Sequence, residues 1–184
     1  MFLRKKTDIF EPLNRRVLHI APEKCLDDRL KKMYGSSYLT ADIQPGLAME
    51  CMDITDIKYN DETFDVIFCS HVLEHISDDK KAINELTRVL KSGGWAIILV
   101  PIDGDYTHED PAITDPKMRE ELYGQSDHVR LYGLKDYLGL LESTGLEVSV
   151  YFPQDILPPE DIIHFGIIEN AGEIFLCKKP CHSK

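Results

Sequence analysis

Several polar side chains stand directly after apolar segments of this sequence, where neighbouring strands of a sheet would end. Asp42 and Asp53 follow two such segments, and Ser70 and His71 follow a third. An open α/β sheet binds its ligands beyond the carboxyl ends of its strands, so these side chains are expected to share one site. Asp42 comes nineteen residues after Glu23 in the first turn, a spacing at which an acid accepts hydrogen bonds from ribose hydroxyls. We therefore expect Asp42 to bind a ribose; the alternative is an acid that only precedes a turn.

The elements that would position these residues alternate between strands and helices. Apolar segments of strand length recur along the chain, at 16–21, 37–42, 48–52, 66–69, 95–100, 146–152 and 173–178. Apolar residues at helical spacing lie between them, at 26–34, 77–92 and 134–144. Gly35 and the pair Gly93-Gly94 are expected to end the first two helices. This alternation predicts a doubly wound α/β fold, in which helices cover both faces of a mostly parallel sheet.

Composition limits the classes of function that fit the chain. Its 184 residues, 43% hydrophobic and 29% charged, predict one domain over 1–184, because no shift in composition divides them. The net charge of -11 gives no basic surface, so no nucleic-acid partner is expected. No apolar stretch reaches membrane-spanning length, and the first residues lack the apolar core of a signal peptide. The five scattered cysteines are interpreted as reduced thiols, which predicts a cytoplasmic protein. We also expect no metal site and no membrane partner.

The segment 64–101 carries the most specific sequence pattern. It reads F-D-V-I-F-C-S-H-V-L-E-H-I-S-D, then a helix, then K-S-G-G-W-A-I-I-L-V-P. Together with Asp42, this pattern resembles the class I, Rossmann-like S-adenosylmethionine-dependent methyltransferases of the methyltransferase type 11 kind, over residues 16–179. The resemblance implies a seven-stranded sheet whose last strand is antiparallel, and S-adenosyl-L-methionine as the cofactor.

The same resemblance assigns roles to individual residues. It implies that Asp42, with Ile43 after it, binds the ribose of the cofactor. It implies that Asp53 and Ile54 meet the adenine edge, through a carboxylate and a backbone amide. It also implies that Ser70 and His71 form the floor of the cleft beside the methionine part. The cofactor contacts that the resemblance implies are thus Asp42, Ile43, Asp53, Ile54, Ser70 and His71.

The first turn departs from the family pattern of an acid followed by a glycine-rich loop. In V-L-H-I-A-P-E, His19 stands at the usual acid, Ala21 at the first glycine and Glu23 at the second. Glycine allows a positive φ, which alanine and proline do not readily supply. Either the cofactor lies differently, with Glu23 meeting its amino group, or the site has lost affinity. The motifs L-H-I-A-P-E at 18–23 and D-H-V-R-L-Y-G at 127–133 resemble a bacterial subgroup, which favours a functional variant.

Candidate catalytic residues lie mostly in the long polar segment 102–132, which we interpret as an acceptor-side loop or lid. His128 is the expected general base, because imidazole titrates near neutral pH, and Asp127 would orient it. His71 would line the acceptor pocket. The alternative is that His128 and Arg130 only pin the loop against the domain.

These observations predict a methyltransferase that acts on a small-molecule or glycan-like acceptor, at oxygen. The alternative is a non-catalytic cofactor-binding or regulatory module on the same scaffold, which the altered first turn favours. A nicotinamide oxidoreductase is disfavoured, because no G-x-G-x-x-G occurs near 18–26. Only a short N-terminal arm, 1–15, precedes the first strand, so we expect a site that is open, completed by a second subunit of a homodimer, or closed by 102–132.

Overall fold

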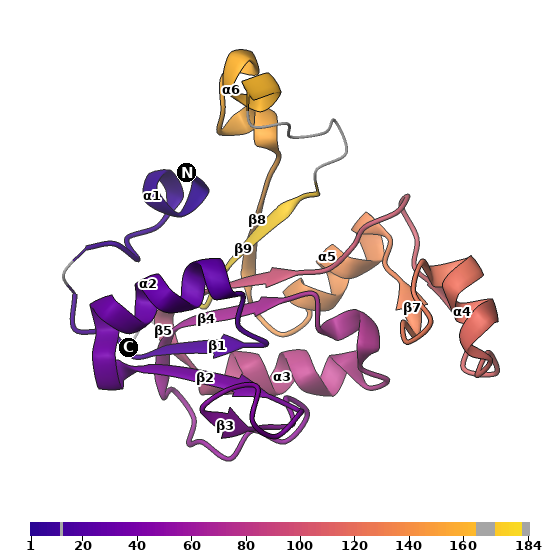
Figure 1. The fold of residues 1–184 in the computed structure, drawn as a ribbon, viewed down its shortest axis with the longest axis horizontal. Helices are drawn as coiled ribbons and strands as arrows, with labels where there is room; N and C mark the ends of the chain where they lie inside the picture. The colour runs from indigo at the N-terminus through magenta and orange to yellow at the C-terminus, as the bar shows by residue number, and fades with distance from the viewer. Residues whose placement is uncertain (12, 165–171, 182–184) are drawn as a thin grey trace.

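A single seven-stranded sheet forms the centre of the computed structural model, which describes residues 1–11, 13–164 and 172–181 (Figure 1). Its strands are β1 (Val17–Ile20), β2 (Tyr38–Asp42), β3 (Glu50–Cys51), β4 (Phe64–Ser70), β5 (Leu90–Leu99), β8 (Glu147–Tyr151) and β9 (Ile174–Lys178). They lie in the order β3-β2-β1-β4-β5-β9-β8, and β9 is antiparallel to both of its neighbours. The predicted fold class is confirmed, and the strand order reverses between β1 and β4, where open sheets bind ligands.

The two central strands form because their residues are apolar at nearly every position. β1 is buried at all four residues, and β4 is buried over Val66–Cys69 by side chains on both faces. Alternate residues of a strand point to opposite faces, and the core divides accordingly. Leu18 and Ile67 contribute to one apolar cluster, whereas Val17 and Val66 contribute to the other.

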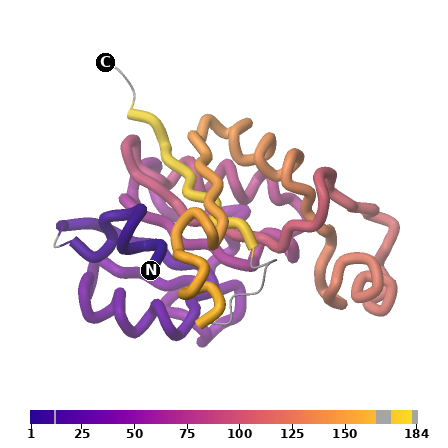
Figure 2. Tube along the Cα trace, turned by 90° about the horizontal axis from the view of Figure 1, so that it is seen from above, coloured from indigo at the N-terminus to yellow at the C-terminus, as the bar shows by residue number. Residues whose placement is uncertain are grey.

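Helices cover both faces of the sheet (Figures 1 and 2). The longest ones are α2 (Lys24–Tyr34), α3 (Asp79–Val89) and α5 (Leu134–Glu142). Leu30 of α2 packs in the cluster that contains Val17, whereas Ile83 of α3 and Tyr137 of α5 pack in the other. The Asp78 side chain caps α3 by accepting a 3.0 Å hydrogen bond from the Lys81 amide.

One predicted helix end is wrong. α3 ends at Val89, and Gly93-Gly94 lie inside β5 instead of terminating the helix. A Cβ atom at Gly94 would lie 2.8 Å from the Asp65 carbonyl oxygen, so a close approach of β4 to β5 requires this glycine. The pair therefore marks an irregular strand start, where the register of β4 and β5 shifts.

The segment 102–132 contains more structure than its weak periodicity indicated. It forms β6 (His108–Glu109), α4 (Pro116–Tyr123) and β7 (Arg130–Leu131), and β6 pairs with β7 in a small antiparallel sheet. The start of α4 is set by Asp115, whose side chain accepts hydrogen bonds from two amides, and by Pro116 in the first turn. In Figure 1 this subdomain projects past the carboxyl ends of the central strands.

Two shorter helices complete the described chain, α1 (Phe2–Lys6) and α6 (Pro159–His164). α1 lies in the N-terminal arm, which Asp8 holds by pairing with Arg15 and by accepting a 3.1 Å hydrogen bond from the Trp95 indole. Among the described residues, no helix has the length and apolar character needed to cross a membrane. The single-domain organisation and the cytoplasmic location stay predictions.

Candidate functional site

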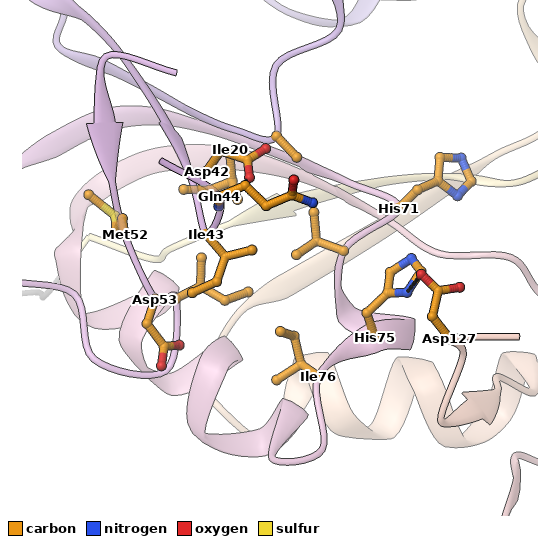
Figure 3. A pocket seen from close by; sticks show the side chains of 13 residues that line it. Ile20, Asp42, Ile43, Gln44, Met52, Asp53, His71, His75, Ile76 and Asp127 are labelled. Carbon is orange, nitrogen blue, oxygen red and sulfur yellow. Dashed lines mark hydrogen bonds and ion pairs between the residues drawn. The ribbon is translucent and has the colours of Figure 1, made fainter. Parts of the chain in front are cut away.

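A cavity of about 380 Å³ opens at the carboxyl ends of β1, β2 and β4 (Figure 3). Its volume is in the range of small-molecule sites. The lining combines apolar side chains with three carboxylates. It consists of Ile20, Ala21, Asp42, Ile43, Gln44, Met52, Asp53, Ile54, His71, Val72, His75, Ile76 and Asp127. The predicted residues Ala21, Asp42, Ile43, Asp53, Ile54, His71 and Asp127 are among them. The structure therefore brings most of the predicted site together, at the reversal point of the sheet.

Asp42 and Asp53 offer free carboxylate oxygens at this cavity. One oxygen of Asp42 accepts a 2.8 Å hydrogen bond from the Gln44 amide, which fixes the carboxylate and leaves its second oxygen for a ligand. Asp53 is exposed, and its Oδ1 accepts 2.8 Å hydrogen bonds from the amide and the hydroxyl of Thr55. These bonds lower the pKa of Asp53, so this carboxylate is held in its charged form.

The first turn is built on a buried hydrogen-bonded chain. His19 is fully buried; its Nδ1 lies 2.8 Å from the Tyr38 hydroxyl and its Nε2 lies 2.6 Å from Glu23 Oε2. Burial raises the pKa of the Glu23 carboxyl, but hydrogen bonds from His19, from its own backbone and from Ser70 lower it more. His19, Glu23 and Ser70 are outside the cavity lining, so the contact of His19 with a ligand would be indirect, through the position of Glu23.

Two residues of the site have a backbone conformation that glycine normally supplies. Ala21 has a φ of 46° and His71 has a φ of 53°. The expectation that alanine at this turn does not adopt a positive φ is therefore wrong. The Ala21 amide donates a 2.8 Å hydrogen bond to the Ala41 carbonyl, and the His71 amide donates one of 2.9 Å to the Leu99 carbonyl, which holds both residues there. Strained residues of this kind concentrate at functional sites.

Replacing Ala21 by Val is expected to lower the free energy of unfolding by about 1–3 kcal/mol, because a β-branched residue clashes at positive φ. Urea denaturation would measure the change. Ala112→Val, on the exposed part of the 102–132 segment, is the control and should change stability by less than about 0.5 kcal/mol. Equal stabilities of the two variants would contradict the positive φ at Ala21.

The three predicted catalytic residues occupy different positions. His71 and Asp127 line the cavity, whereas His128 is 3% exposed and is not in the lining. A hydrogen bond with Glu74 raises the pKa of His71, against the effect of partial burial. Asp127 pairs with His75 rather than with His128, at 3.2 Å from Oδ2 to Nδ1.

Arg130 is the structural link between the projecting subdomain and the site. It is 2% exposed, and its guanidinium donates to the backbone carbonyls of Leu73 and Ser77 and forms an ion pair with Glu109 at 2.7 Å. These bonds hold β7 against the 3-10 helix η2 (Leu73–His75), which follows β4. Arg130 thus holds the 102–132 segment against the rest of the domain, which is the alternative role that the sequence left open for it.

Several residues of the site were not predicted from the sequence. Gln44, Met52, His75 and Ile76 line the cavity, and Glu74 bonds to His71 beneath it. For Glu74 and His75 a signal was present in the motif V-L-E-H-I, where this polar pair interrupts an apolar run. A polar pair inside an apolar run indicates buried polar groups that need partners.

Known proteins resemble this chain in sequence. Residues 10–98 match the family described as methyltransferase domain. Ajmaline N-methyltransferase of Rauvolfia serpentina is 28% identical over 107 residues, which are 58% of this chain and 37% of the relative. The uncharacterized methyltransferase YcgJ of Bacillus subtilis is 28% identical over 90 residues, 49% of this chain and 34% of the relative. The matched part thus spans little more than a third of these relatives' length.

Solved structures resemble it in fold over nearly the whole chain. A SAM-dependent methyltransferase from Archaeoglobus fulgidus has a TM-score of 0.60 at 17% identity, covering 96% of this chain and 91% of the other. One from Mesorhizobium loti has a TM-score of 0.59 at 12% identity, covering 92% and 94%. The predicted resemblance to a methyltransferase family is confirmed by the match over residues 10–98, and these solved structures share the fold of the chain.

Proposed function

We propose that this chain is a class I, S-adenosylmethionine-dependent methyltransferase that binds this cofactor in the cavity beside Asp42 and transfers its methyl group. The observation that carries the proposal is the position of that cavity. It lies where the strand order reverses, and Asp42 at the end of β2 offers a free carboxylate oxygen to a ribose. The three carboxylates of the lining also favour a ligand with a positively charged sulfur.

Most of the proposed cofactor contacts come from the lining of the cavity, and Ser70 and Glu23 are added from outside it. Asp42 accepts hydrogen bonds from the ribose hydroxyls, and Ile43 packs on the sugar and base. Asp53 and Ile54 meet the adenine, with the exposed oxygen of the carboxylate as acceptor. Ser70 and His71 lie at the methionine end, where Glu23, held by His19, is within reach of the Ser70 hydroxyl and faces the amino group. Ala21 closes the turn in place of the usual glycine.

The acceptor is proposed to be a small molecule or a glycan-like compound, methylated at oxygen. Methyl transfer from a sulfonium is an in-line displacement, so the protein contributes mainly by holding donor and acceptor in line. His71 and Asp127 line the cavity at the end away from Asp53 (Figure 3), which supports the proposal that they orient an acceptor hydroxyl. The projecting subdomain that carries Asp127 is the proposed acceptor-side lid, and a second subunit would be the other way to cover the site.

The experiment is a titration calorimetry measurement with S-adenosylhomocysteine, followed by an assay for S-adenosylhomocysteine release with paired hydroxyl and amine acceptors. We expect binding in the micromolar range and turnover with hydroxyl compounds. Release with amines alone would contradict oxygen methylation while leaving the cofactor proposal intact. Absence of binding would contradict the enzyme and favour a non-catalytic module.

A further inference from the structure

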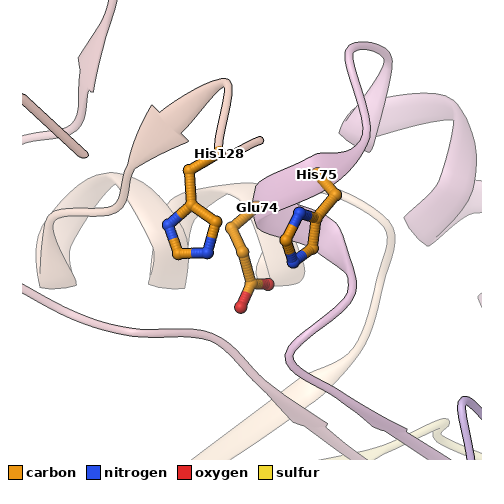
Figure 4. A group of neighbouring side chains, drawn as sticks. All are labelled: Glu74, His75 and His128. Atoms are coloured by element: carbon orange, nitrogen blue, oxygen red, sulfur yellow. The ribbon is translucent and has the colours of Figure 1, made fainter. Parts of the chain in front are cut away.

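Three side chains capable of binding a metal converge beside the cavity (Figure 4). One candidate ligand atom from each of Glu74, His75 and His128 lies within 4.8 Å of the other two. The rings of His75 and His128 meet edge to face, with centroids 4.8 Å apart. In Figure 4 the Glu74 carboxylate lies between the two imidazoles.

Two of the three residues are buried with an unsatisfied polar atom. Glu74 is 2% exposed and His128 is 3% exposed. Glu74 Oε2 and His128 Nε2 have no hydrogen-bond partner among the residues that the structure describes. Leaving a buried polar atom without a partner costs about 1–3 kcal/mol, and more if it is charged. Two such atoms in residues of one cluster suit a ligand that binds both residues.

The outer hydrogen bonds of both histidines are those of metal ligands. His128 Nδ1 lies 2.9 Å from the Tyr123 carbonyl oxygen, which only accepts, so Nδ1 carries a proton, and in the neutral ring Nε2 presents the lone pair. His75 Nδ1 lies 3.2 Å from Asp127 Oδ2, which leaves its Nε2 free. Histidines that bind a metal commonly donate their other N–H group to a carbonyl or a carboxylate. Both types of partner occur here.

The fold holds the three residues together from two distant segments. The Val129 amide donates a 2.9 Å hydrogen bond to the Glu74 carbonyl, which places His128 directly opposite η2. Arg130 donates to the carbonyls of Leu73 and Ile76 on either side of Glu74-His75. The backbone beneath the cluster is therefore fixed, and the remaining freedom is in the side chains.

We propose that Glu74, His75 and His128 bind a divalent transition-metal ion of the zinc type. Two imidazoles and one carboxylate suit zinc and its neighbours, whereas magnesium and calcium prefer oxygen ligands alone. A tetrahedral ion with bonds of about 2.1 Å holds its ligand atoms about 3.4 Å apart, so binding requires any pair of them to approach by at most about 1.4 Å. Rotation of half-buried His75 supplies this movement. The fourth position stays open, on the side of the cavity that His75 and Asp127 line.

The test is titration of the full chain with Zn²⁺, with methyl transfer playing no part in the readout. The exposed thiols Cys25, Cys51 and Cys181 are first replaced by serine, because they compete for zinc. We expect one ion per chain, and an increase in Tm of about 5–10 °C at zinc concentrations about 100 times the Kd.

The decisive variants in this background are His128→Asn and Glu74→Gln. Asn keeps a donor for the Tyr123 carbonyl while removing Nε2, so the fold is retained. Each variant should weaken zinc binding by more than about 100-fold and abolish the increase in Tm. His108→Ala, on exposed β6, is the control and should bind like the parent. No zinc binding by the parent, or zinc binding by His128→Asn and Glu74→Gln as tight as that of the parent, would overturn the proposal.

Discussion

Replacing Arg130 by Ala should lower the free energy of unfolding by about 3–5 kcal/mol. The guanidinium is 2% exposed, and its loss takes a donor from the Ser77 carbonyl and the Glu109 carboxylate. It also leaves the Leu73 carbonyl and the Asp79 carboxylate with fewer partners, since Tyr132 still donates to both. Removing one partner of a buried ion pair typically has a cost of this size. Urea denaturation, monitored by circular dichroism, would measure it.

Arg88 provides the comparison for this variant. It also bridges several groups, Glu85, Asp61 and the Tyr59 carbonyl, but its side chain is 30% exposed. Water can replace some of its bonds, so Arg88→Ala should cost less than half as much as Arg130→Ala. A loss below about 1 kcal/mol for Arg130→Ala would show that the projecting subdomain does not depend on this residue.

Replacing Asp42 by Ala is expected to weaken S-adenosylhomocysteine binding by about 10- to 150-fold. A charged hydrogen-bond partner contributes about 1.5–3 kcal/mol, and the proposed bonds to the ribose all pass through this carboxylate. Calorimetry at constant salt would measure the ratio of the two dissociation constants. Stability should change little, because the carboxylate is only partly buried and accepts one hydrogen bond from the Gln44 amide.

Asp28→Ala, exposed on α2 and remote from the cavity lining, is the matched control for charge. It removes one negative charge from the same chain, and its affinity should stay within about twofold of the parent because distant surface charges are screened. If Asp42→Ala and Asp28→Ala bound equally, the ribose assignment would be wrong.

The fold was predictable because its central strands are locally unambiguous. β1 and β4 are continuous apolar runs, and such runs are typical of strands covered on both faces. Asp42 could be assigned to the end of β2 because the strand is short, so the position of its last residue can be predicted from the sequence. The seven-stranded sheet with an antiparallel last strand followed from the resemblance to a known family.

The parts that were missed depend on contacts between distant segments. His128 meets Glu74 only because Arg130 and the Val129 amide bind the backbone of η2, and neither bond leaves a pattern in the sequence. α4 was missed because its apolar face is weak, although Asp115 and Gly124 are good capping residues. The positive φ of Ala21 was missed because propensity disfavours it and only tertiary hydrogen bonds enforce it.

A crystal structure of the protein with S-adenosylhomocysteine would test the proposed site most directly. We expect the ribose hydroxyls within about 3.2 Å of the Asp42 carboxylate, the adenine between Ile43 and Ile54, and the sulfur toward His71. A nucleoside bound elsewhere, or a cavity filled by the protein's own side chains in the presence of saturating ligand, would contradict it.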